Sequence, residues 1–157
     1  MIFVTVGTHE QSFCRLIKKI DELKINGIID EEVIMQIGYT NYKPQKCKWQ
    51  KLIGFDLMKK YCKEARIIIT HGGPGSIMMA LQNNKKPIVV PRMKEFNEHV
   101  DNHQVLFCKK MESFNKIVPV YDIESLQSVI LNYNDEKIEY KSNTKNFVAK
   151  LEQILME

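Results

Sequence analysis

Short apolar runs alternate with amphipathic segments over most of the chain. The runs are rich in β-branched residues and show no polar alternation, which is typical of strands buried on both faces of a sheet. They lie at residues 2–6, 33–38, 67–69, 87–91 and 117–120. Between these runs and after the last of them, apolar residues recur at helical spacing. This spacing predicts helices over residues 13–23, 55–64, 75–84, 98–111, 123–133 and 146–157.

The first predicted helix shows the pattern most clearly. Its apolar stripe, at positions i, i+3, i+4, i+7 and i+10, consists of Phe13, Leu16, Ile17, Ile20 and Leu23. We expect Ser12 to cap its N-terminus, because a serine hydroxyl accepts from the unpaired N–H groups there. The periodicity is lost over residues 39–54, so this segment is expected to be irregular, with a short strand at 51–53.

Buried strands joined by helices predict an α/β fold, a three-layer domain in which helices cover both faces of a mostly parallel sheet. We expect the whole chain, residues 1–157, to form one such domain. In sheets of this kind, ligands bind beyond the carboxyl ends of the strands. Gly7 and Thr8, the loop 71–76 and Arg92 each follow a predicted strand, so we expect them to meet at one edge.

The composition is that of a globular protein of ordinary size. The chain has 157 residues, of which 44% are hydrophobic and 27% are charged. The apolar runs are too short to cross a membrane, and the first residues lack the basic flank and cleavage site of a signal peptide, so we expect a cytoplasmic protein. The four cysteines form no C-x-x-C pair, which argues against a zinc site or a disulfide framework.

The net charge of +4 is modest and unevenly distributed. A nucleic-acid binder would carry a denser basic stripe with interleaved aromatic residues, so we expect no nucleic-acid partner. Residues 39–66 hold eight basic residues and two acidic ones, a net charge of +6. This segment is either an ordinary solvated face or a surface for acidic lipid head groups or an acidic partner.

The stretch 67–81 has the pattern of a strand, a glycine loop and a helix. The loop residues with candidate roles are Gly72, Gly73, Gly75 and Ser76. The glycines let a ligand approach the backbone closely, and Pro74 suits the first helical turn. A helix N-terminus has unpaired N–H groups and about half a positive charge, so it attracts phosphate. The alternative is a tight connection that binds nothing.

Nucleotide-binding motifs of other kinds are absent from the sequence. The glycine loop lacks the G-x-G-x-x-G spacing of dinucleotide-binding proteins, and no Walker lysine follows it. A redox enzyme or an NTPase is therefore disfavoured.

A second group of polar residues follows the run at 87–91. It consists of Glu98, His99, Asp101, Asn102, His103 and Gln104. Carboxylate, amide and imidazole groups in this mixture favour the recognition of sugar hydroxyls. On the predicted helix His99 and His103 would stand at i, i+4, a metal-ligand spacing, but no second ligand pair accompanies them, so metal binding is disfavoured. A solvated helix face is the remaining alternative.

His9 and His71 each lie next to the end of a predicted strand. Either could be a general base, a phosphate donor or a packed core residue. For His71, the adjoining glycines favour a nearby ligand.

Four segments, in matching order, resemble the Alg13-like or PssE-like glycosyltransferase subunits. They are residues 6–8, 70–76, 87–92 and 96–104, and the resemblance spans roughly residues 1–110. It implies a Rossmann-like domain equivalent to the C-terminal half of a GT-B glycosyltransferase, the half that holds a UDP-sugar.

The resemblance also implies roles for individual residues. Those assigned to the donor diphosphate are Gly7, Thr8, His71, Gly72, Gly73, Gly75 and Ser76. Those assigned to the donor sugar are Arg92, Glu98, His99, Asp101, Asn102, His103 and Gln104. No metal or other cofactor is expected. The general base is expected from a partner, with His9 as the reserve candidate. Related proteins often carry a ribose-binding glutamate where this chain has Met78 and Met79, which leaves the nucleotide contact open.

The function implied is that of the donor-binding subunit of a two-component inverting hexosyltransferase. It would use a UDP-sugar and a polyprenyl-diphosphate-linked acceptor in capsule or exopolysaccharide synthesis, at the membrane through an Alg14-like anchored partner. Residues 146–157 are the candidate docking helix. The alternatives are a non-catalytic enhancer that stabilises the partner and a homodimeric transferase active alone.

Overall fold

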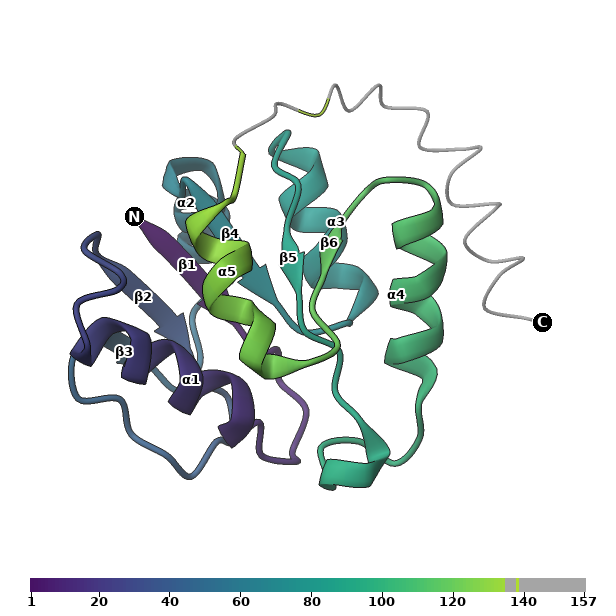
Figure 1. Cartoon of the computed structure of the whole chain (residues 1–157), viewed down its shortest axis with the longest axis horizontal. Coiled ribbons are helices and arrows are strands. Elements are labelled where there is room, and N and C mark those ends of the chain that lie inside the picture. The colour runs from purple at the N-terminus through teal and green to yellow at the C-terminus, as the bar shows by residue number, and fades with distance from the viewer. Residues whose placement is uncertain (135–137, 139–157) are drawn as a thin grey trace.

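The computed structural model describes residues 1–134 and 138, and its centre is a parallel sheet (Figure 1). The strands are β1 (Ile2–Thr5), β2 (Val33–Gln36), β3 (Lys48–Gln50), β4 (Ile67–Thr70), β5 (Ile88–Val89) and β6 (Val118–Pro119). They lie in the order β3-β2-β1-β4-β5-β6, and every neighbouring pair is parallel. This is the doubly wound order: β2 and β3 follow one another on one side of β1, and β4, β5 and β6 follow one another on its other side.

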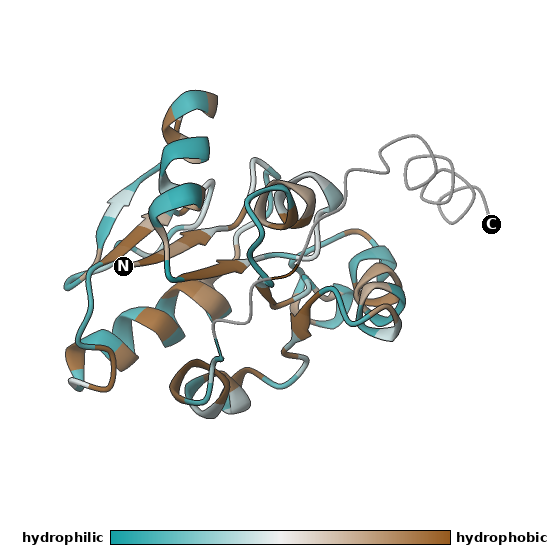
Figure 2. Ribbon diagram, turned by 90° about the horizontal axis from the view of Figure 1, so that it is seen from above, coloured by the Kyte–Doolittle hydropathy of each residue, from teal (hydrophilic) through white to brown (hydrophobic). Residues whose placement is uncertain are grey.

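Helices cover both faces of the sheet (Figures 1 and 2). They are α1 (Cys14–Ile25), α2 (Phe55–Glu64), α3 (Pro74–Gln82), α4 (His103–Ser113) and α5 (Leu126–Leu131), with 3₁₀ turns at Lys94–Phe96 and Ile123–Ser125. Successive strand residues point to opposite faces, so Ile2 and Val4 pack with α1 and α5 while Phe3 packs with α2. The prediction of a three-layer α/β domain is confirmed.

The strand register brings two loops together at the carboxyl edge of the sheet. Thr5 at the end of β1 pairs with Thr70 at the end of β4. The segments that follow these strands, from Val6 and from His71, therefore begin side by side. This point between β1 and β4 is the switch point of the sheet, where ligands of doubly wound proteins bind.

Three predictions about local structure are wrong. The helix predicted over 98–111 begins only at His103, because the 3₁₀ turn and the left-handed Asn97 (φ 56°) come first. Ser12 does not cap α1: the cap residue is Phe13, and its N–H donates to Thr40 Oγ1 (3.2 Å). The short strand expected at 51–53 is Lys48–Gln50, at the edge of the sheet.

Two further points concern the ends of the elements. The helix expected over 123–133 is a 3₁₀ turn followed by α5, which ends at Leu131. The predicted helix 146–157 lies outside the described residues. Within residues 1–134 and 138, no helix is long and apolar enough to cross a membrane.

Candidate functional site

His71 lies at the switch point, with its ring between two glycines. Its backbone N–H donates to Thr5 O (3.3 Å), which ties the end of β4 to β1. A Cβ at Gly7 would lie 2.6 Å from the His71 Cε1, and one at Gly73 would lie 2.9 Å from Cδ2 and closer still to Nε2. Gly7 also has a φ of +72°, which other residues rarely adopt. These two glycines therefore make room for the imidazole.

The His71 ring is neutral at physiological pH. Burial lowers its pKa from 6.5 to about 4, and the positive charge of Arg92 lowers the pKa further in the same direction. Its Nδ1 lies 3.3 Å from Thr70 Oγ1. A neutral imidazole has one donor and one acceptor nitrogen, so His71 offers a hydrogen bond rather than a charge.

Gln104, in the first turn of α4, joins two loops of the carboxyl edge. Its Oε1 accepts from the backbone N–H of Gly72 (3.0 Å) and from that of Arg92 (3.0 Å). A Cβ at Gly72 would lie 2.8 Å from Gln104 Cβ and 3.0 Å from Cys108 Sγ. Gly72 is thus required for close packing against α4, and its N–H is already paired. In this structure Gln104 and Gly72 hold the loop in place.

The N-terminus of α3 is open to solvent at this edge. The helix predicted over 75–84 spans Pro74–Gln82, with Pro74 in the first turn as expected. The cap residue is Gly73, which has no side chain to cap the helix. A Cβ at Gly75 would meet nothing within 4 Å, and Gly75 itself is exposed. The N–H groups of Gly75 and Ser76 belong to the first turn, where backbone donors have no intrahelical acceptor. The dipole of α3 adds a partial positive charge at the same place, which favours a negatively charged group there.

Arg92 is fully buried behind this opening. Its guanidinium donates to three backbone oxygens: Gln11 O (2.7 Å), Val6 O (2.9 Å) and Glu98 O (3.1 Å). It also lies over the Phe13 ring, 4.8 Å from the centroid. Burial lowers its pKa to about 10, so it keeps its positive charge at pH 7. The Arg92 side chain therefore holds three backbone segments together, and its positive charge is buried behind the carboxyl edge of the sheet.

Glu98 is also engaged inside the protein. Its carboxylate accepts from Arg15 Nε (2.9 Å) and Nη2 (2.8 Å) and from the Met93 N–H (3.1 Å). Arg15 donates in addition to Pro91 O (3.0 Å) and stacks on the Phe96 ring at 4.8 Å. The pair fixes the loop after β5 to α1.

The exposed polar groups of the edge are His9, Thr8 and the loop before α4. The rings of His9 and His99 are 4.8 Å apart, and burial followed by the charges of His99 and Arg92 lowers the pKa of His9. The Asp101 carboxylate lies 3.0 Å from His99 Nδ1 and 2.7 Å from His103 Nδ1. Asn102 Oδ1 accepts from the Lys94 N–H (3.0 Å). Among the described residues, no group of His, Cys, Asp and Glu is arranged to hold a metal ion.

Two supporting residues had not been expected from the sequence. Arg15 lies in the predicted first helix, but its partner Glu98 is 83 residues away and no local pattern links them. Gln36 ends β2, donates to Gly7 O (3.3 Å) and accepts from the Ile53 N–H (2.9 Å). Arg15 therefore had no signal in the sequence. Gln36 had one, because a glutamine at the end of an apolar strand is a polar group that needs a partner.

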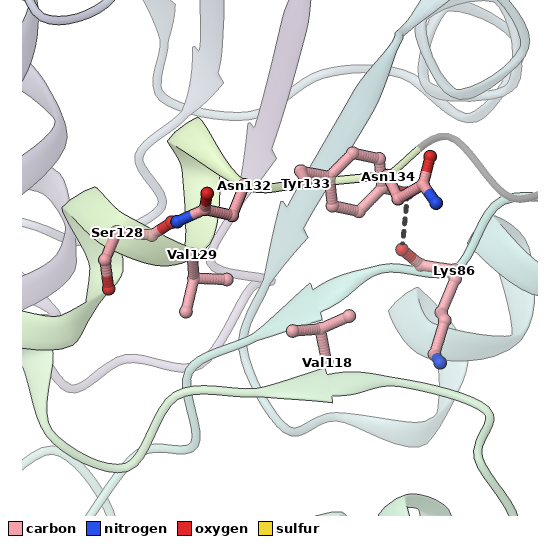
Figure 3. A pocket seen from close by; sticks show the side chains of 7 residues that line it. All are labelled: Lys86, Val118, Ser128, Val129, Asn132, Tyr133 and Asn134. Carbon is pink, nitrogen blue, oxygen red and sulfur yellow. Dashed lines mark hydrogen bonds between the residues drawn. The ribbon is translucent and has the colours of Figure 1, made fainter.

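A cavity of about 390 Å³ lies at the opposite edge of the sheet (Figure 3). It is lined by Lys86, Val118, Ser128, Val129, Asn132, Tyr133 and Asn134. The Tyr133 hydroxyl donates to Lys86 O (2.7 Å) across it. Lys86 precedes β5 and Val118 begins β6, so the cavity is at the amino ends of the strands, away from the polar cluster.

The sheet order and the helices on both faces define a Rossmann-like α/β domain equivalent to the C-terminal half of GT-B glycosyltransferases. Residues 1–156 match the glycosyltransferase family 28 C-terminal domain, and the chain belongs to this family. No curated protein matches the sequence.

Solved structures with the same fold include two glycosyltransferases. One is described as the glycotransferase of kitacinnamycin, with a TM-score of 0.62 and 15% identity over 83% of this chain. The other is SnogD from Streptomyces nogalater, with a TM-score of 0.54 and 18% identity over 83% of this chain. The match covers 34% of each of those chains, so the present chain spans about a third of their length.

Proposed function

We propose that this chain is the donor-binding subunit of a two-component inverting glycosyltransferase that uses a UDP-sugar. The observation that carries the proposal is the open N-terminus of α3 at the switch point, with free space at Gly75 and the buried cation Arg92 nearby. A diphosphate there would accept from the N–H groups of Gly75 and Ser76 and lie close to Gly7 and Thr8. The donor sugar would face His99, Asp101, Asn102 and His103.

The reaction would be a direct displacement at the anomeric carbon. An acceptor hydroxyl attacks that carbon, the bond to the diphosphate oxygen breaks, and a base takes the hydroxyl proton. Negative charge grows on the leaving UDP, and the helix dipole, the loop N–H groups and Arg92 stabilise it without requiring a metal ion. The base comes from the partner subunit, with His9 as the reserve candidate because it is partly exposed at the same edge.

The partner is an Alg14-like membrane-anchored subunit that supplies the second wall of the cleft. The acceptor is a polyprenyl-diphosphate-linked sugar, and the product is a lipid-linked unit of a capsule or exopolysaccharide. The chain works in the cytoplasm at the inner face of the membrane. The likeness of four sequence segments to such subunits supports this division of labour.

Calorimetric titration of the purified chain with UDP, with and without magnesium, tests the donor site. Gly75→Glu puts a carboxylate at the helix N-terminus, where it favours the helix but repels a diphosphate, so UDP binding is expected to disappear while the fold is kept. Gly54→Glu is the matched control, because Gly54 precedes α2 and a Cβ there also meets nothing within 4 Å. Equal UDP affinity of the Gly75→Glu variant and the parent chain would overturn the diphosphate assignment.

A non-catalytic enhancer is the second candidate. It is favoured by Met79 at the position of the usual ribose ligand and by the internal engagement of Glu98 and Gln104. The complex of both subunits separates the two functions. Transferase activity that persists in a complex carrying Gly75→Glu supports the enhancer, and activity lost with assembly intact supports donor binding.

A further inference from the structure

Exposed apolar side chains gather at the carboxyl ends of β2 and β3. Tyr39 follows β2 and is 44% exposed, while Leu52 and Phe55, between β3 and the first turn of α2, are 48% and 66% exposed. The Gly38 N–H donates to Lys51 O (2.9 Å), which holds the two segments side by side. We call Tyr39, Lys51, Leu52, Phe55 and Lys59 the edge patch.

Two lysines of the edge patch lie against its aromatic rings. Lys51 Nζ is 4.5 Å from the centroid of the Tyr39 ring, and Lys59 Nζ is 5.2 Å from that of the Phe55 ring. Each ammonium thus stands at the rim of an exposed apolar surface. Lysine and aromatic side chains adopt this arrangement where a protein surface meets a lipid–water boundary.

The positive charge of residues 39–66, the segment that holds the edge patch, is only partly neutralised within the described chain. Lys48 and Arg66 pair with Glu32 and Glu31, so they contribute little net charge. No described residue forms an ion pair with the six other lysines of the segment, Lys43, Lys46, Lys51, Lys59, Lys60 and Lys63, and all six are exposed. Residues 39–66 contain two acidic residues, Asp56 and Glu64.

We propose that the edge patch docks on a lipid bilayer that carries anionic head groups. Leu52, Phe55 and Tyr39 would enter the interfacial region, and Lys51 and Lys59 beside them would meet the negative surface potential. A lipid surface accepts basic side chains in any arrangement, which suits lysines spread over a strand edge and a helix. A protein partner would need acidic groups in register with them.

Docking in this way orients the candidate site. The edge patch and the N-terminus of α3 both lie at the carboxyl ends of the parallel strands, so docking through the β2 and β3 side places the open end of the candidate site beside the bilayer. A lipid-linked acceptor would then lie within reach of the donor. This consequence rests on the proposed function, whereas membrane binding itself does not.

Co-sedimentation of the full chain with vesicles tests the docking. Vesicles of equal parts phosphatidylcholine and phosphatidylglycerol are expected to bind the chain, more weakly as salt is raised, and phosphatidylcholine alone is not. The double variant Leu52→Ser/Phe55→Ser is expected to lower partitioning about tenfold or more, because two apolar anchors are lost. These side chains are exposed, so circular dichroism should show an intact fold.

The matched control is Leu106→Ser/Phe114→Ser, which makes the same two kinds of substitution and changes no charge. Leu106 in α4 is 63% exposed and Phe114 at the end of α4 is 49% exposed, and α4 lies on the side of the sheet away from β2 and β3 (Figure 1). This control should keep vesicle binding. No binding to anionic vesicles, equal binding to neutral ones, or equal loss in the control would each overturn the proposal. UDP titration of the same variants should be unchanged, which keeps a failure here distinct from a failure of the donor site.

Discussion

At the scale of single residues, His71 makes stability depend on pH. Its pKa is about 4 in the folded chain and 6.5 in an ordinary environment. Above pH 6.5 the imidazole is therefore neutral in the folded and the unfolded state, and it lowers the stability of neither. As pH falls from 6.5 to 4, the unfolded state takes up a proton that the folded state refuses, and stability falls. The loss from this group is on the order of 2 kcal/mol at pH 5.

Denaturant unfolding of the parent chain and of His71→Gln at pH 7.5 and pH 5 measures this effect. Other groups titrate equally in both proteins, so the difference between their two pH dependences isolates the imidazole. The parent is expected to lose more stability than the variant. If both proteins lost the same free energy of unfolding between pH 7.5 and pH 5, the folded chain would take up the proton on His71, and the ring would not be held as we describe.

The glycines around His71 should respond very differently to alanine. Gly73→Ala forces a methyl group into the imidazole, and we expect a loss of about 2 kcal/mol or more in the free energy of unfolding. Gly75→Ala should be neutral or slightly stabilising, because the space is open and alanine favours a helix. Thermal and denaturant unfolding of both variants check this. Comparable stability of the two variants would contradict the close packing at Gly73.

At the scale of elements, the Arg15–Glu98 pair joins α1 to the loop that precedes α4. Side-chain exposure is 14% for Arg15 and 4% for Glu98, so removing one partner leaves a poorly solvated charge. Either Arg15→Met or Glu98→Gln is expected to cost about 3 kcal/mol, and the double variant less than the sum. A double-mutant cycle by denaturant unfolding measures the coupling. Additive losses would mean that the two side chains act independently.

The elements that the sequence predicts well are those with a clear apolar period. The helix at 55–64 has one apolar stripe, and the strands after Met1 and before His71 are unbroken apolar runs, so few other signals compete. The helix expected from residue 98 fails because a dense polar run has no apolar stripe to fix its start. There, Asn97 in the left-handed region and the Asp101 side chain, which accepts from the His103 N–H (3.0 Å), favour a loop instead.

At the scale of the whole molecule, strand order explains what sequence reasoning could and could not find in the site. Parallel strands bring Gly7, His71 and Arg92 to one edge, and that inference needs only the strand positions. Which polar groups face outward is set by partners far apart in the chain, such as Arg15 for Glu98 and Val6 O for Arg92. No local pattern records such contacts, so the side chains held inside the protein could not be separated from those left open.

One wall of a cleft can bind a donor without completing a reaction. The carboxyl edge offers donors for a diphosphate, whereas we assign the base that deprotonates the acceptor to the partner, with the partly exposed His9 in reserve. We therefore expect the purified chain to bind UDP but to release none from a UDP-sugar when a lipid-linked acceptor is added, and to do so only with its partner subunit. A coupled assay for UDP release measures this. Release by the chain alone, rising with the square of its concentration, would instead identify a homodimeric transferase and would remove the need for a second subunit.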